Sequence, residues 1–159
     1  MLVEFALVCI VMGMFVCGMI DLGRAVFIKQ VIVNLSREGS SLASRGTSLA
    51  ATTQAVVDSS APLTLNTKGC VIVTTVTNTS GVLRISAQQP QGGTCGSVAS
   101  KIGAGAGKPA TMPPTTVVIP PSGQTAYVTE VFYQYAPVTP IGSLFNTLVP
   151  TTMYDAAYF

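Results

Sequence analysis

Acidic side chains are the first residues to consider for chemistry, because carboxylates act as general acids, general bases and metal ligands. The chain has 159 residues, of which six are Asp or Glu and none is His. Without His, the usual general base and the commonest metal ligand are both missing. The acids are spread along the chain and form no local pair. We therefore expect a protein that is not an enzyme and that uses neither a metal nor a cofactor.

Two other kinds of site are only weakly indicated. Ser and Thr are plentiful, but no His can activate them and no Ser–Lys spacing suggests a nucleophile. The run from Gly103 to Lys108 (GAGAGK) resembles a phosphate-binding loop, yet Ile102 and Pro109 stand where that loop requires Gly and Ser or Thr. The net charge is +2, without any basic run. Neither nucleotides nor nucleic acids are expected partners.

The four cysteines form two pairs of different character. Cys9 and Cys17 lie in an apolar run, about 12 Å apart along a helix, which is too far for a bond within one chain. We expect them to be small packing residues. Cys70 and Cys95 lie in polar sequence, and in an oxidising compartment we expect a disulfide worth roughly 3 kcal/mol. The alternative is two free thiols in a reducing compartment.

An apolar run, Leu2–Ile20, interrupted only by Glu4, dominates the N-terminal part of the chain. The apolar character resumes after Asp21 and Arg24 and continues to Ile28, so a helix here is long enough to cross a membrane. A carboxylate beside lipid is costly and points to a function. In a helical assembly Glu4 could compensate the buried N-terminal amine of a neighbouring chain. Alternatively it interacts with its own helix N-terminus, which is favourable by about 0.3–1 kcal/mol.

The segment from Met1 to about Ala61 contains no Pro and is predicted to be one long helix, continuous or merely kinked. Apolar residues recur every seven positions in its second half, at Ile28, Leu35, Leu42, Leu49 and Val56. Four places after the first four of these come Ile32, Gly39, Gly46 and Thr53, mostly small, which suits close packing on a sheet or helix. The alternative is that Gly39 and Gly46 break the helix.

The remainder of the chain reads as β structure and loops. Cys70–Asn78 and Val82–Ala87 predict a hairpin, and Gln88–Pro114 predicts a long surface loop. A brief strand is expected at Thr115–Ile119 and the clearest one at Thr125–Tyr135. Together with the helix, these elements predict an α+β fold with a small antiparallel sheet.

Three tyrosines, Tyr127, Tyr133 and Tyr135, share one face of the strand expected at Thr125–Tyr135. Both faces of this strand are partly apolar, so it is expected to be central and covered on both sides. We expect half-buried rings with outward hydroxyls, and the alternative is a surface platform for a carbohydrate or a partner. The apolar tail within Pro137–Phe159 is expected either to pack on the sheet as a last strand or to form an intersubunit surface.

The N-terminal sequence resembles that of TadE-like pilins of the type IV pilin superfamily. The similarity is carried by the VEFALV opening at Val3–Val8, the box Asp21-Leu22-Gly23-Arg24, and Arg37-Glu38-Gly39. A looser similarity covers Val131–Pro137 with Pro140. The acid that is fifth in mature chains of the family is fourth here, at Glu4.

This resemblance implies a prepilin that inserts in the bacterial inner membrane, is cut by a prepilin peptidase, and is polymerised by a secretion ATPase and a platform protein. It favours the intersubunit role of Glu4. We therefore expect assembly residues at Glu4, Phe5, Gly13, Gly18, Asp21 and Arg24.

The expected organisation is a membrane-spanning and filament-core helix over 1–28, its amphipathic continuation over 29–61, and a β-rich domain with a stapled loop over 62–159. The expected function is a homo-oligomeric, extracellular Tad pilus filament on the cell surface. The alternatives are a minor pilin or pseudopilin at the inner membrane, and a single-pass anchored periplasmic binding domain.

Overall fold

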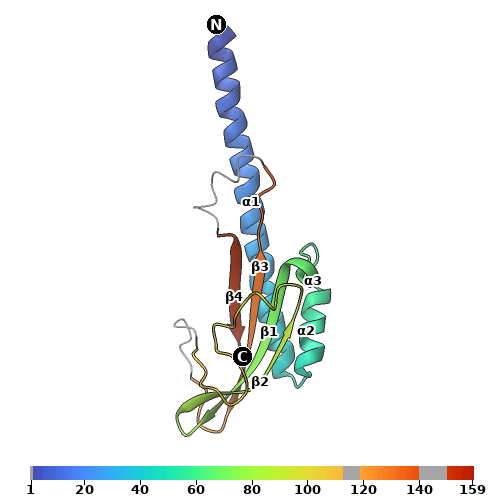
Figure 1. The fold of residues 1–159 in the computed structure, drawn as a ribbon, viewed down its shortest axis with the longest axis vertical. Helices are drawn as coiled ribbons and strands as arrows, with labels where there is room; N and C mark the ends of the chain where they lie inside the picture. Colours follow the sequence, from blue (N-terminus) through green and yellow to red (C-terminus); the bar gives the residue numbers. More distant parts are fainter. Residues whose placement is uncertain (1, 113–118, 140–149) are drawn as a thin grey trace.

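The fold is organised around one long helix, α1 (Leu2–Ser44), which runs along the long axis of the molecule (Figure 1). The computed structural model describes residues 2–112, 119–139 and 150–159. At about 1.5 Å per residue, 43 residues give a helix roughly 65 Å long. Its first half projects away from the remainder, and its second half lies against a sheet (Figure 1). The buried side of the second half follows helical spacing and comprises Asp21, Ala25, Ile28, Ile32, Leu35, Ser36, Gly39, Ser40 and Ala43.

The prediction of one helix to Ala61 is wrong, because the chain turns at Gly46, one of the two glycines that the alternative named. Gly46 has a φ of +88°, in the left-handed region that ends helices, and its amide donates to the Ala43 carbonyl. A second helix, α2 (Leu49–Asp58), follows, with the Ser48 side chain accepting a bond from the Ala51 amide as an N-cap. Residues 29–61, which were predicted to continue one helix, thus belong to two helices, the second half of α1 and α2.

Gly39, by contrast, stays inside α1. A Cβ at this position would lie 2.7 Å from Thr129 Cγ2 and 3.0 Å from Val56 Cγ2. Gly39 therefore allows α1, α2 and the sheet to approach closely. This is the close packing that the row of mostly small residues predicted.

The sheet is antiparallel and four-stranded, with the order β2-β1-β3-β4. After the short helix α3 (Leu65–Lys68) come β1 (Gly69–Thr79), β2 (Val82–Gln91), β3 (Thr125–Gln134) and β4 (Thr152–Tyr158). The α+β class, the hairpin, the central strand and the last strand in the tail are confirmed. The expected strand over 115–119 lies almost entirely outside the described residues, as do Pro140, Leu144, Phe145, Leu148 and Val149.

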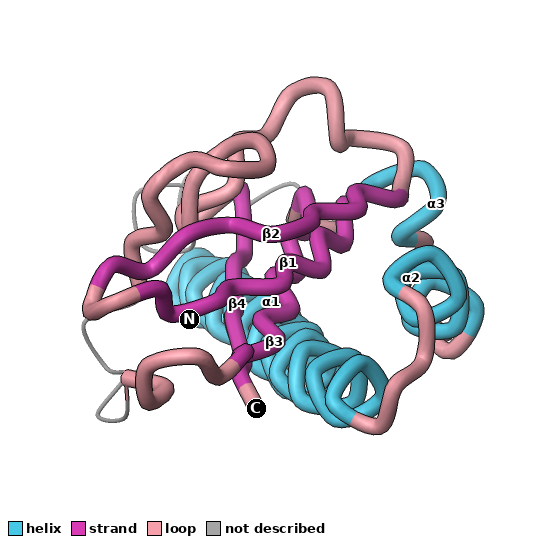
Figure 2. The backbone as a smooth tube through the Cα atoms, turned by 90° about the horizontal axis from the view of Figure 1, so that it is seen from below, coloured by secondary structure: helices cyan, strands magenta, loops and turns pink. Residues whose placement is uncertain are grey.

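Alternate residues of the strands face two different cores. Val71, Val73 and Val131 pack with the buried side of α1 and with Val56 of α2. On the other face, Cys70, Ile72 and Phe132 pack beneath the loop that follows β2. Figure 2 shows the helices on one side of the sheet and this loop on the other.

The loop after β2 is attached to the sheet by a covalent bond. Cys70 of β1 and Cys95 form the expected disulfide, with 4.9 Å between their Cα atoms. The loop starts later than expected because β2 continues to Gln91. Cys9 and Cys17 are free thiols.

Candidate assembly surface and the contacts that position it

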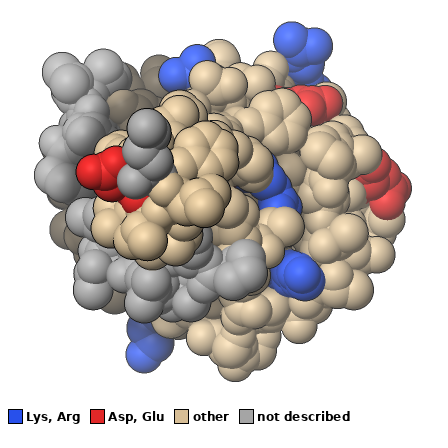
Figure 3. Space-filling view, turned by 90° about the horizontal axis from the view of Figure 1, so that it is seen from above, with Lys and Arg blue, Asp and Glu red and all other residues tan. Residues whose placement is uncertain are grey.

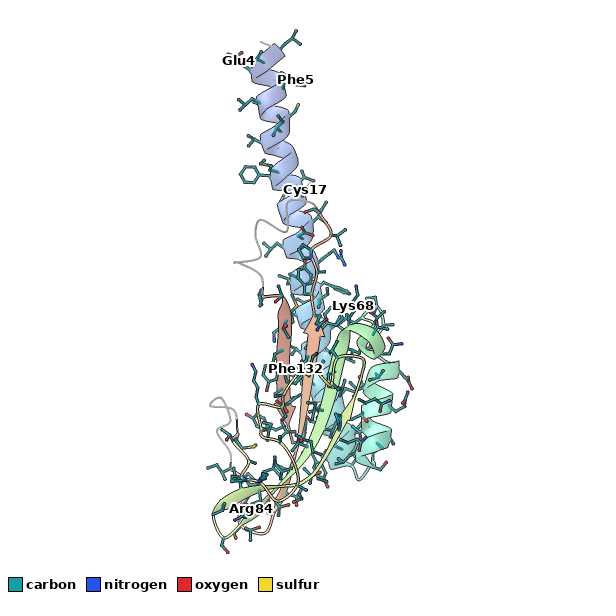
Figure 4. All side chains as sticks on the ribbon, viewed as in Figure 1. Glu4, Phe5, Cys17, Lys68, Arg84 and Phe132 are labelled. Carbon is teal, nitrogen blue, oxygen red and sulfur yellow. A yellow bond between two sulfur atoms is a disulfide. The ribbon has the colours of Figure 1, made fainter. Side chains whose placement is uncertain are left out.

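The projecting half of α1 exposes an apolar surface on all sides. From Leu2 to Ile20 the large side chains are between 43% and 87% exposed. Figure 4 shows Glu4 and Phe5 at the end farthest from the sheet. Among the described residues α1 is the one helix long and apolar enough to cross a membrane. Because the same helix continues into the protein core, this surface is a fixed part of the folded molecule.

The predicted assembly residues Phe5, Gly13 and Gly18 lie on the surface of this half, and Glu4 lies near its end. Phe5 is 69% exposed, and the Glu4 side chain lies in the first turn of the helix. A Cβ added at Gly13 or Gly18 would meet no atom of the described residues within 4 Å. Unlike Gly39, these two glycines have no packing role among the residues that the structure describes.

Asp21, also predicted as an assembly residue, joins α1 to the segment after β3 within the subunit. One carboxylate oxygen accepts from the amides of Val138 at 2.9 Å and Thr139 at 3.3 Å. The other oxygen accepts from the Thr139 hydroxyl. Asp21 is only 6% exposed, whereas Arg24, one turn later, is exposed and attracts this carboxylate electrostatically. The contact lies where the projecting part of the helix meets the sheet.

Tyr127 and Tyr133 of β3, and Tyr135 directly after it, lie on the face of the sheet that packs against α1. Tyr135 is buried, and its hydroxyl donates to the Asp21 carbonyl at 2.9 Å. Burial raises the pKa of Tyr135, and the nearby Asp21 charge adds to this effect. Tyr127 and Tyr133 are half-buried beside the main core. The half-buried expectation is met for these two, whereas the buried hydroxyl of Tyr135 corrects the expectation of outward hydroxyls.

Polar contacts join the second half of α1 to β4. Ser36 donates to Asp155 at 2.7 Å, and Ser40 donates to the Ala157 carbonyl at 2.6 Å. Lys29 donates to Asp155 at 2.9 Å and to the Tyr154 carbonyl at 2.7 Å. The Ser36 and Ser40 hydroxyls thus provide hydrogen-bond donors to polar groups of β4. An apolar side chain at either position would leave these groups of the strand unpaired.

A buried acid that the sequence reasoning did not single out, Glu130, holds the loop on the opposite face. It is completely buried and accepts bonds from the Ser100 hydroxyl, the Lys101 amide at 2.8 Å and the Tyr154 hydroxyl at 3.0 Å. Burial, followed by the Glu130 charge, raises the pKa of Tyr154 above its ordinary range. The signal in the sequence was a lone acid in the apolar, central strand.

No described arrangement suggests catalysis or metal binding. Within residues 2–112, 119–139 and 150–159, no cluster of three or more His, Cys, Asp or Glu could hold a metal ion. The glycine-rich run does not form a phosphate cradle, because the Gly107 amide donates to the Ile85 carbonyl and the Gly105 amide to Gln88. Figure 3, viewed from the end that bears the projecting helix, shows scattered charges on a mostly uncharged surface.

Comparison with known proteins gives one match. Residues 1–41 match the family model described as TadE-like protein. No curated protein and no solved structure matches the chain. The matched segment contains the projecting half of α1, Asp21 and Arg24, and most of the buried stripe. The match confirms the resemblance drawn from the N-terminal motifs, and over residues 1–41 the chain is similar to TadE-like proteins, which fits a subunit associated with the Tad pilus.

Proposed function

We propose that this protein is a structural pilin subunit that polymerises through the projecting half of α1 into a Tad-type filament. The supporting observation is the continuous exposed apolar surface from Leu2 to Ile20 on a helix rooted in the core. Such a surface must be covered by lipid or by protein. In a membrane the helix anchors the subunit, and in a filament the helices of other copies replace the lipid.

Two features of the projecting half favour packing between copies. Gly13 and Gly18 present backbone that no described residue outside α1 covers, so a second helix can approach closely at these points. Glu4 places a carboxylate near the helix start, where it can compensate the N-terminal amine of a neighbouring copy and select one register. Phe5 beside it supplies apolar contact area.

In this proposal the subunit begins in the bacterial inner membrane and is extracted during assembly. A prepilin peptidase, a secretion ATPase and a platform protein are the expected machinery, and the extracellular filament is the product. Asp21 then has an intramolecular role, because its contacts to Val138 and Thr139 fix how the sheet domain sits on the helix. Arg24 is exposed and stays a proposed contact between copies.

The test is electron microscopy of material from cells that produce the wild-type chain or the Glu4→Ala chain. We expect filaments from the wild type and a membrane-bound, unassembled Glu4→Ala protein at equal abundance. Glu38→Ala is the matched control, because Glu38 is an exposed acid on the same helix beyond the projecting half. A Glu4→Ala chain that polymerises as well as the control would contradict the proposed role of Glu4.

The second candidate is a minor pilin or pseudopilin that remains near the inner membrane, since the same helix would anchor it there. Copy number separates the two, because a filament subunit is the main component of purified fibres. The anchored binding domain is not proposed, because α1 covers the tyrosine face that would present the ligand site.

A further inference from the structure

A groove lies between α1 and the beginning of β4, just beyond the projecting half of the helix. Its volume is about 590 Å³. The helix contributes Leu22, Ala25 and Val26, and the strand contributes Met153 and Tyr154. The apolar walls are therefore continuous with the exposed apolar surface of α1. Lys29 and Lys101 also line the groove and supply its positive charges.

Both lysines contact the same residue, Tyr154. Lys29 donates to the backbone carbonyl of Tyr154 at 2.7 Å, while the Lys101 ammonium lies 3.8 Å from the centre of the Tyr154 ring. Lys29 also pairs with Asp155, yet its side chain remains 46% exposed. An ammonium has three donors, so each lysine keeps capacity for a further acceptor.

Lys101 is held in place by the structure around it. Its backbone amide donates to the buried Glu130 carboxylate, and the preceding residue, Ser100, donates to the same carboxylate. The disulfide between Cys70 and Cys95 attaches the same loop to the sheet. The ammonium over Tyr154 is therefore part of a preorganised site.

The groove begins where the membrane-spanning length of the helix ends. A hydrocarbon core of about 30 Å takes about 20 helical residues, which from Leu2 ends near Asp21. Leu22 and Val26 follow directly, and Lys29 lies eight residues after Asp21, about 12 Å further along the helix axis. The two acids beside the groove are compensated, because Asp155 is paired with Lys29 and the Glu130 carboxylate accepts hydrogen bonds from Ser100, Lys101 and Tyr154.

We propose that this groove binds an anionic phospholipid, whose acyl chain lies along Leu22 and Val26 and whose phosphate contacts Lys29 and Lys101. The proposal rests on the membrane-anchored stage of the proposed function. The bound lipid would fix the height of the sheet domain above the bilayer before the subunit is extracted.

The chain contains no Trp, so Val26→Trp introduces a single reporter in the groove wall. In detergent, phosphatidylglycerol with brominated acyl chains should quench this Trp at an at least threefold lower concentration than brominated phosphatidylcholine. Lys101→Gln should abolish the difference, and Lys108→Gln, a lysine of the same loop outside the groove, should preserve it. Native mass spectrometry, on chains that keep Val26, should show that Lys108→Gln retains phosphatidylglycerol as wild type does and that Lys101→Gln retains less.

Equal quenching by both lipids, or a preference that survives Lys101→Gln, would overturn the proposal. Flotation with vesicles of phosphatidylcholine alone separates this failure from failure of the membrane stage. A chain that floats but shows no preference contradicts only the lipid site, whereas a chain that does not float contradicts the membrane anchor and the lipid site together. Filament formation by Lys101→Gln should equal that of wild type.

Discussion

Removal of the Glu130 carboxylate should release the loop that the disulfide holds at its other end. In Glu130→Ala, the Ser100 hydroxyl, the Lys101 amide and the Tyr154 hydroxyl lose their common acceptor. A buried donor left without a partner costs about 1–3 kcal/mol. Because Ser100 and Tyr154 are only half-buried, water can replace part of this loss, so the lower end, about 3 kcal/mol in total, is expected.

This loss is large compared with the roughly 5–15 kcal/mol that stabilises a typical domain. It should shift the denaturant midpoint of the full chain in detergent, with the disulfide intact. If the structure opens only at the loop, the loss of about 3 kcal/mol raises the population of molecules with an open loop roughly 100-fold. Trypsin can report this opening, because Lys101 lies within the loop and its amide is bound by Glu130.

Glu130→Gln is the informative companion, because it keeps the shape and one acceptor while placing an amide donor among existing donors. We expect an intermediate loss, and Glu38→Ala, at an exposed site, should change neither quantity. The reasoning is refuted if Glu130→Ala unfolds at the same denaturant concentration as Glu38→Ala and is cut after Lys101 no faster.

Two further predictions concern glycine and tyrosine. Gly39→Ala should destabilise the subunit by about 1–3 kcal/mol through overpacking against Thr129. Leucine at Gly13 or Gly18 should instead leave the unfolding midpoint unchanged and reduce the filament yield in electron micrographs. Filaments at wild-type yield from both leucine variants would refute close packing between helices at these glycines. The pKa of Tyr154 is raised above 10.0, so the unfolded chain loses this proton at lower pH than the folded chain; the stabilisation is complete below pH 10 and is lost as the pH rises further. Unfolding free energies measured from pH 8 to 11 should therefore fall less steeply in Tyr154→Phe than in wild type, and parallel curves would contradict this.

The elements were largely predictable from sequence because their signals are local. β-branched runs predicted the hairpin and the central strand, and the apolar run predicted the projecting helix. The end of α1 was missed although Gly46 is followed closely by Ser48, a pairing typical of one helix ending and another beginning. Gly39 looks similar in the sequence but stays helical, because Thr129 and Val56 pack against it, and no local signal carries that information.

The contacts around the candidate surface were less predictable because they join residues far apart in the sequence. Asp21 was assigned to assembly, yet its partners Val138 and Thr139 lie more than 100 residues away. The alternation of β3 separated two faces correctly, but it could not tell which face α1 would cover. That choice buried Tyr135 against the helix and left Glu130 beneath the loop.

The lysine at the border of β4 has a consequence for how copies can associate. In the described part of the sheet, β4 pairs with β3 alone and forms an edge. A bare edge can recruit strands from other molecules, and crowding of subunits in a membrane or fibre would promote such runaway sheet growth. Lys29 occupies the Tyr154 carbonyl and brings a charge to this border. A charge at this border disfavours the addition of further strands, so the proposed assembly through the projecting helix would not compete with growth of the sheet.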